Sequence, residues 1–145
     1  MHLDRYAVVA NHQHSSYEFL SSGPKGTIRK VVLFQPLATG IYNLAFGDWD
    51  EAAQEIRDDT RSNNADSDRV LSTVAFTVTD FMAYHPQAIL FAKSATPAKT
   101  RFYQIGINNH WHQISRLYEV EGFIEGTWEL FRQNRNYQAF ALKIK

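Results

Sequence analysis

The sequence has no cysteine and no net charge, and both absences narrow the range of functions. Without cysteine, the 145 residues cannot form disulfides, thiolate zinc sites or a cysteine nucleophile. The 15 basic and 15 acidic residues cancel. Binding to a nucleic-acid backbone is therefore disfavoured, although a local basic patch remains possible. No apolar run approaches the ~20 residues of a membrane span, and the N-terminus lacks the apolar core of a secretory signal. We therefore expect a cytoplasmic protein with no membrane partner.

Apolar residues are plentiful, and the first half of the chain has the pattern of strands. Hydrophobic residues make up 44% of the sequence, which predicts one packed domain over residues 1–145. Residues 1–14 are a candidate for a loosely attached N-terminal segment. The stretches "YEFLSS" and "TIRKVVLFQPL" flank "GPKG", a composition typical of a hairpin turn. "IYNLAFGDWD" is a third strand, and "EIRDDTRS" is its hairpin partner across "EAAQ". The alternative is a short helix over Glu51 to Arg57.

The second half alternates helices and strands. In "SDRVLSTVAFTVTDFMAYHP" the apolar residues fall at helical spacing, so we expect a helix that begins near Asp66 or Ser67 and ends before Pro86. "AILFA" is a short strand, and a helix from Pro97, broken near Gly106, continues through "HWHQISRLY". "EVEGFI" and "YQAFALKIK" close the sheet. The order β-β-β-(β)-α-β-α-β-β predicts an α+β domain. It would have a mostly antiparallel twisted sheet of about six or seven strands with two main helices.

The stretch "FAKSATPAKTR" has the features of an anion site. A strand that leads into a helix leaves backbone N–H groups unpaired, and the helix dipole adds partial positive charge there. Ser94 and Thr96 supply hydroxyl donors, while Lys93, Lys99 and Arg101 supply full charges. This combination suits a phosphate or a carboxylate. The alternative is an ordinary helix with Thr96 as N-cap and solvated cations.

Two further groups of residues could supply proton transfer or ligand contacts. Asp48 is a candidate general base in the acidic turn "FGDWDE", where a hairpin would place Asp58 and Asp59 opposite it. A solvated acidic turn is the favoured alternative. Tyr103 and Tyr118, both expected on the later helices, are candidate proton donors, although most helix tyrosines only pack.

An amide and two histidine pairs complete the candidate residues. Asn63, in "SNN", could contact the ligand or cap the first long helix. "HQH" would place two imidazoles on one face of a strand, and "HWH" would separate them by about 200° on a helix. Neither pair has a third ligand at a suitable spacing, so we predict no metal site.

Taken together, "YEFLSSGPKGTIRKVVLF", "NLAFGDWDE", "SNNADSDRVLSTVAFTVTDF" and "SATPAKTRFYQIGI" resemble a family of short bacterial proteins. The family, frequent in the Bacteroidetes, is a domain of unknown function. The resemblance spans about Tyr17 to Phe140 and implies a bacterial, single-domain protein, but it implies no activity. The element order is also similar to the acetyl-coenzyme A-dependent N-acetyltransferase fold, in which Tyr118 would match a general acid. Those enzymes bind pyrophosphate at a glycine-containing turn, whereas this chain has "NNADSDRVL" there.

Three functions follow, in order of preference. The first is a domain that binds an anionic, phosphate-bearing small ligand of nucleotide or coenzyme A type and is transferase-like. The alternative is a non-enzymatic interaction protein, such as a toxin–antitoxin or phage-defence component with a partner encoded nearby. The third is a nucleic-acid binder that uses Lys25, Arg29 and Lys30. The sequence assigns no cofactor and no oligomeric state.

Overall fold

The computed structural model describes residues 4–57, 64–94 and 96–145, and these form nine strands and three helices. In chain order they are β1 (Val9–Ala10), β2 (Ser16–Gly23), β3 (Gly26–Ala38), β4 (Ile41–Asp50), β5 (Glu55–Arg57), α1 (Ser67–Tyr84), β6 (Ile89–Ala92), α2 (Pro97–Asn109), α3 (Trp111–Leu117), β7 (Tyr118–Ile124), β8 (Thr127–Leu130) and β9 (Ala139–Ile144). No helix in these ranges is long and apolar enough to cross a membrane.

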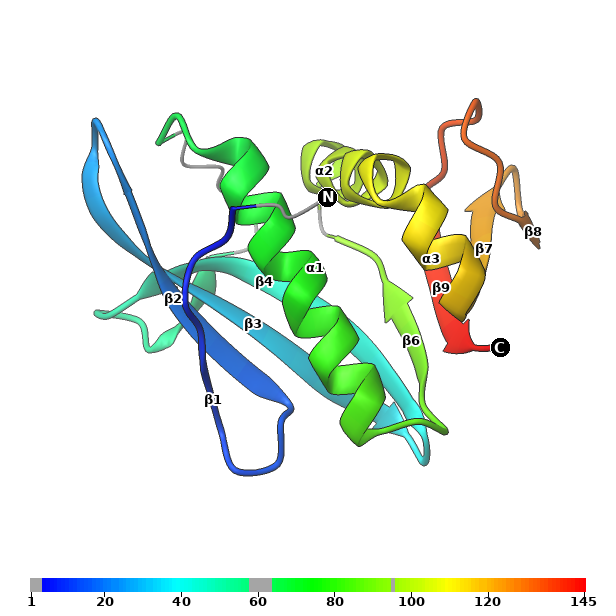
Figure 1. The fold of residues 1–145 in the computed structure, drawn as a ribbon, viewed down its shortest axis with the longest axis horizontal. Coiled ribbons are helices and arrows are strands. Elements are labelled where there is room, and N and C mark those ends of the chain that lie inside the picture. The colour runs from blue at the N-terminus through cyan, green and yellow to red at the C-terminus, as the bar shows by residue number, and fades with distance from the viewer. Residues whose placement is uncertain (1–3, 58–63, 95) are drawn as a thin grey trace.

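The strands form a single sheet in the order β1-β2-β3-β4-β6-β9-β7-β8, with β5 paired to β4. All neighbours are antiparallel except β4 and β6, whose parallel pairing covers only residues 41–43 and 89–91. Helix α1 connects these two strands, and Figure 1 shows all three helices on one face of the sheet. The predicted α+β class with a mostly antiparallel sheet is confirmed.

The sheet has more strands than expected because the short strand β1 and the hairpin that contains β8 were not predicted. Strands β7 and β8 are joined by Glu125 and Gly126, whose φ values are 51° and 79°. Two consecutive residues with positive φ form the tight turn that matches the twist of a hairpin. Strand β5 pairs with the end of β4. The hairpin interpretation is therefore confirmed for Glu55–Arg57, and the short helix is not present there.

The predicted hairpin at "GPKG" and the predicted first helix are both present. β2 and β3 pair up to Gly23 and Gly26, and Gly26 has a φ of 87°. Helix α1 ends at Tyr84, two residues before Pro86. Its apolar stripe packs on the sheet through Val70, Leu71, Val74, Phe81 and Met82.

The core continues as a row of stacked aromatic rings. Tyr6, Phe19, Phe46 and Phe102 follow one another with centroid separations of 5.7, 6.4 and 5.9 Å. They come from the N-terminal segment, β2, β4 and α2, so the row joins four separate parts of the chain. Within residues 1–14, Tyr6 is buried, and its backbone N–H donates to the Thr73 hydroxyl on α1 at 2.9 Å.

Three local predictions differ from the structure. The later helix is interrupted at His110, not near Gly106, and Tyr118 is the first residue of β7 rather than a helical residue. The pairing of β7 with β9 begins at Tyr118, and this pairing outweighs the helical preference of the preceding residues. His12 and His14 lie in the turn between β1 and β2, not on a strand.

Candidate functional site

The predicted anion site at the start of α2 has the expected backbone geometry. Thr96 is the N-cap, and its hydroxyl accepts a hydrogen bond from the Lys99 N–H at 3.2 Å. The Ser94 hydroxyl accepts from the Thr96 N–H at 3.3 Å. Lys93 and Arg101 are exposed. The backbone and hydroxyl arrangement therefore suits either a ligand or a well-capped helix.

The charges of this segment do not converge on the helix start. Lys99 is buried, and its Nζ donates to the carbonyl of Phe46 at 3.0 Å and lies 4.7 Å from the centre of the Phe46 ring. That carbonyl lies beyond the point where β4 and β6 stop pairing. Asp48 pairs with Lys30 at 2.6 Å. In the described ranges Arg101 forms no ion pair with Asp48 or any other acid.

The carboxylates of the acidic turn have partners in the protein: Asp48 pairs with Lys30 and Glu51 with Arg29. Asp50 accepts hydrogen bonds from the N–H groups of Ala52 and Ala53, both at 3.1 Å. Asp58, Asp59 and Asn63 lie outside the described residues. Among the residues that are described, no cluster of three or more His, Asp or Glu side chains could hold a metal ion.

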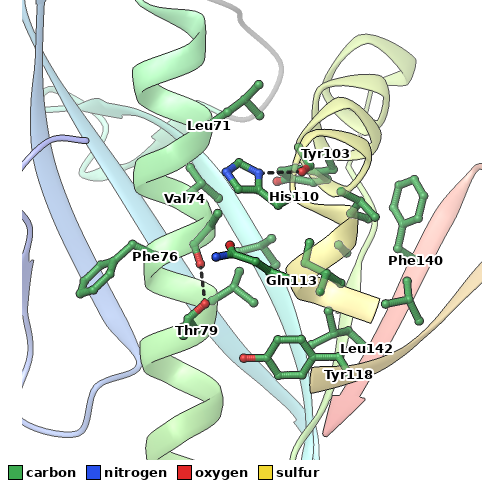
Figure 2. Close-up of a pocket in the computed structure, with 18 of the residues that line it drawn as sticks. Leu71, Val74, Phe76, Thr79, Tyr103, His110, Gln113, Tyr118, Phe140 and Leu142 are labelled. Carbon is green, nitrogen blue, oxygen red and sulfur yellow. Dashed lines mark hydrogen bonds between the residues drawn. The ribbon is translucent and has the colours of Figure 1, made fainter. Parts of the chain in front are cut away.

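A cavity of about 640 Å³ lies between α1 and the α2–α3 pair (Figure 2). Gly106 permits the close approach of α2 to α1, since a Cβ there would lie 3.2 Å from Leu71 Cδ2. Apart from Tyr118 at the start of β7, the side chains that the sheet contributes to the cavity are apolar: Leu44, Leu90, Ala92, Val120, Phe140 and Leu142. The cavity thus has an apolar floor formed by β4, β6, β7 and β9.

The polar lining of the cavity comes from the helices, the N-terminal segment and the start of β7. It includes Tyr103 and Tyr118, so the structure brings the two predicted tyrosines to one cavity. None of the predicted ligand residues at positions 93–101 lines it. Among the residues that the structure describes, no Asp or Glu lines it either, whereas Arg5, Arg116 and His110 do.

Tyr118 and Thr79 form a polar pair within the cavity. Burial raises the pKa of Tyr118, and a hydrogen bond with the Thr79 hydroxyl lowers it in part. Thr79 in turn donates to the Ala75 carbonyl at 3.2 Å (Figure 2). A phenol with a raised pKa stays protonated near neutral pH, so Tyr118 can act in hydrogen bonding or as a proton donor rather than as a base.

His110 lies at the junction of α2 and α3 and was predicted only as part of a histidine pair. It is the C-cap of α2, and its Nδ1 lies 2.9 Å from the Gly106 carbonyl. Sequence reasoning did not place it at a ligand site, because the helix was expected to run through it. A break between two helices that points a histidine into a cavity leaves no distinct spacing signal.

A second cluster of titratable groups lies away from the cavity, where the β1–β2 turn meets α1. Asp80 Oδ2 accepts from the Tyr17 hydroxyl at 2.6 Å and lies 2.7 Å from His14 Nδ1. The His14 ring stacks on Tyr84 with centroids 3.6 Å apart. Burial and then the Asp80 hydrogen bond raise the pKa of Tyr17. This cluster fastens the turn to α1.

The full-length resemblance is supported by a family match. Residues 2–145 match DUF6934, a family of unknown function. The chain belongs to this family. No curated protein and no solved structure shows a significant match. This membership confirms the predicted resemblance to a family of unknown function, and it assigns no chemistry to the chain.

Proposed function

We propose that this DUF6934 protein binds an anionic small molecule with an apolar body in the cavity between α1 and the α2–α3 pair. The cavity itself is the observation that supports the proposal, since ligand sites are typically apolar clefts of about 300–1,000 Å³ with a few polar groups. Phosphate-bearing ligands of nucleotide or coenzyme A type remain within this class. We also propose that the protein is bacterial and cytoplasmic.

The apolar floor favours a ligand with a substantial hydrocarbon or aromatic portion. Leu90, Val120 and Phe140 are each less than 5% exposed, and they form part of the floor. Contact with such side chains contributes about 25 cal/mol for each Å² of apolar surface removed from water. Inorganic phosphate has no apolar surface to place against these side chains, so inorganic phosphate alone is a poor match.

The charge of the lining favours an acidic group on the ligand. In the described part of the chain, Arg5, His110 and Arg116 line the cavity and carry or can accept a positive charge, and no carboxylate lines it. Arg5 donates to the Tyr6 carbonyl at 3.0 Å and lies 3.6 Å from the centre of the Phe76 ring, which places its guanidinium beside α1. A cationic ligand would find no counter-ion among these residues.

The proposal is tested by a substitution that fills the cavity with a larger side chain. Ala75 lines it, so Ala75→Phe should occupy the ligand volume, whereas Ala98→Phe makes the same chemical change at an exposed position of α2. Thermal-shift screening and calorimetry would use nucleotides, acyl-coenzymes and aliphatic carboxylates. We expect a stabilising ligand that binds the wild type and Ala98→Phe but not Ala75→Phe. If no ligand in this panel stabilises the wild type, the proposal fails.

A second candidate function is supported by the face of the sheet that carries no helix. Exposed apolar side chains lie there on strands β6 and β8, and they are Ile89, Trp128 and Leu130. Trp128 is packed on this face against Phe91 with ring centroids 5.6 Å apart. Such a surface suits a protein partner, as in a toxin–antitoxin or phage-defence pair. Co-expression with the neighbouring gene product should give a complex that Leu130→Glu disrupts. A partner bound equally well by Leu130→Glu would argue against this face.

A further inference from the structure

His110 has a defined tautomer at the edge of the cavity. Its Nδ1 lies 2.9 Å from the Gly106 carbonyl, and because a carbonyl only accepts, Nδ1 must carry the hydrogen. Figure 2 shows the ring between α1 and α2, with its second nitrogen, Nε2, on the side of α1. In the neutral ring Nε2 therefore holds a lone pair directed toward the space between the helices.

The surroundings of this nitrogen are mainly apolar. Leu71 and Val74 lie beside the ring on α1 and cannot hydrogen-bond, and the Gln113 amide is the polar side chain that Figure 2 labels in this part of the cavity. A ligand group placed here gains most from His110 if it can give or share one proton, because an unpaired charge in such surroundings is costly.

We propose that His110 binds the headgroup of a carboxylic acid of medium chain length, with the chain lying along the apolar floor. This inference rests on the proposed function and names the ligand class. A carboxylic acid and a neutral imidazole together carry no net charge, and proton sharing converts them into a charge-assisted hydrogen bond inside the cavity. A phosphate dianion would leave excess negative charge after pairing with one imidazole.

The length of the cavity sets the size of the acid. Its α1 wall runs from Leu71 to Thr79, which at 1.5 Å per residue is about 12 Å. An extended chain comparable to that of decanoate matches this length. Arg116, which is exposed and also lines the cavity, adds positive potential at the rim that favours entry of the anion.

The test compares decanoate, decanol and decyl phosphate, titrated calorimetrically into the full chain. We expect decanoate to bind at least about tenfold more tightly than decanol, the ratio that one charge-assisted hydrogen bond supplies. His110→Gln should weaken decanoate binding about tenfold and change decanol binding by less than about threefold. His112→Gln is the matched control, because His112 is exposed and does not line the cavity. It should change neither affinity.

A spectroscopic measurement keeps the test informative if His110→Gln is unstable. In the wild type labelled with ¹⁵N-histidine, decanoate should shift the Nε2 resonance of His110 and leave that of His112 in place. Equal affinities for decanoate and decanol, or an unchanged His110 resonance, would overturn the carboxylate assignment. Binding of decyl phosphate or an acyl-coenzyme without binding of decanoate would also overturn the carboxylate assignment, but it would leave the proposed function standing. If nothing in the wider panel binds, the proposed function itself fails.

Discussion

Replacing Asp80 with alanine should lower the free energy of unfolding by about 2 kcal/mol at neutral pH. The carboxylate accepts from the Tyr17 hydroxyl at 2.6 Å and pairs with His14 Nδ1 at 2.7 Å. Hydrogen bonds to a charged group contribute roughly 1.5–3 kcal/mol each when buried. Asp80 and His14 have side chains that are 23% and 26% exposed, so solvent screening reduces their part of this sum. In Asp80→Ala the Tyr17 hydroxyl can still donate to the His14 carbonyl, at 3.1 Å, which also limits the loss of stability.

Urea unfolding of a double-mutant cycle measures this coupling. Tyr17→Phe, Asp80→Ala and the double variant should show an interaction energy of about 1 kcal/mol, because both single changes break the same hydrogen bond. Costs that add within about 0.3 kcal/mol would refute the inference that the two groups stabilise each other. Ser72→Ala, at another half-buried position on α1, controls for loss of a side-chain oxygen from the helix.

The same pair predicts how stability depends on pH. Burial alone would raise the pKa of Asp80, but the hydrogen bonds from Tyr17 and His14, together with the charge of His14, lower it overall. A carboxyl whose pKa is lowered by folding stabilises the protein above its unfolded pKa, which is about 3.9 for Asp. That contribution disappears as the pH falls through the lower, folded pKa. The stability difference between wild type and Asp80→Ala should therefore shrink as the pH falls below about pH 4. A difference that stays the same down to pH 2 would contradict the lowered pKa.

Two further predictions concern packing and the alternative anion site. Gly122→Ala should destabilise the protein by about 2 kcal/mol in thermal unfolding, because the added Cβ would overlap the ring of Tyr137. That ring is held by its hydroxyl, which donates to Glu129 at 2.7 Å. Arg101→Ala should leave ligand binding in the cavity unchanged. Loss of that binding without loss of stability would instead support the anion site at the start of α2.

Local backbone chemistry was the part of the fold most accessible to sequence reasoning. Thr96 followed by Pro97 identifies a helix start because a hydroxyl can cap the free N–H groups and proline presets φ. The two glycines of "GPKG" identify a hairpin for similarly local reasons. Strand β8 was missed although "EG" carries the same kind of signal, because the four residues after it are too few to show an alternating pattern. Tyr118 was misassigned because its partner in the sheet, Ile144, is distant in sequence.

The cavity had no signature in the sequence. Its lining comes from the N-terminal segment, all three helices and four strands, and each apolar member has the spacing of an ordinary core residue. Whether such residues fill a volume or leave it open depends on how far apart the helices lie. Tyr103 and Tyr118 were chosen for their chemistry, and the fold brings both to the cavity.

The two candidate sites are attached to opposite ends of α2, and the direction of Lys99 distinguishes them. An anion at the start of α2 would be strengthened most by the cation on its first turn, yet the Lys99 ammonium is directed to the Phe46 carbonyl in the core. Lys93 and Arg101 remain as exposed cations, and surface charges of that kind interact weakly through solvent. At the other end, His110 faces a cavity with an apolar floor, and none of the described residues lining that cavity is a carboxylate. An acidic headgroup in that cavity would be screened much less by solvent and salt than one at the surface, so one imidazole there can contribute more to affinity than both exposed cations.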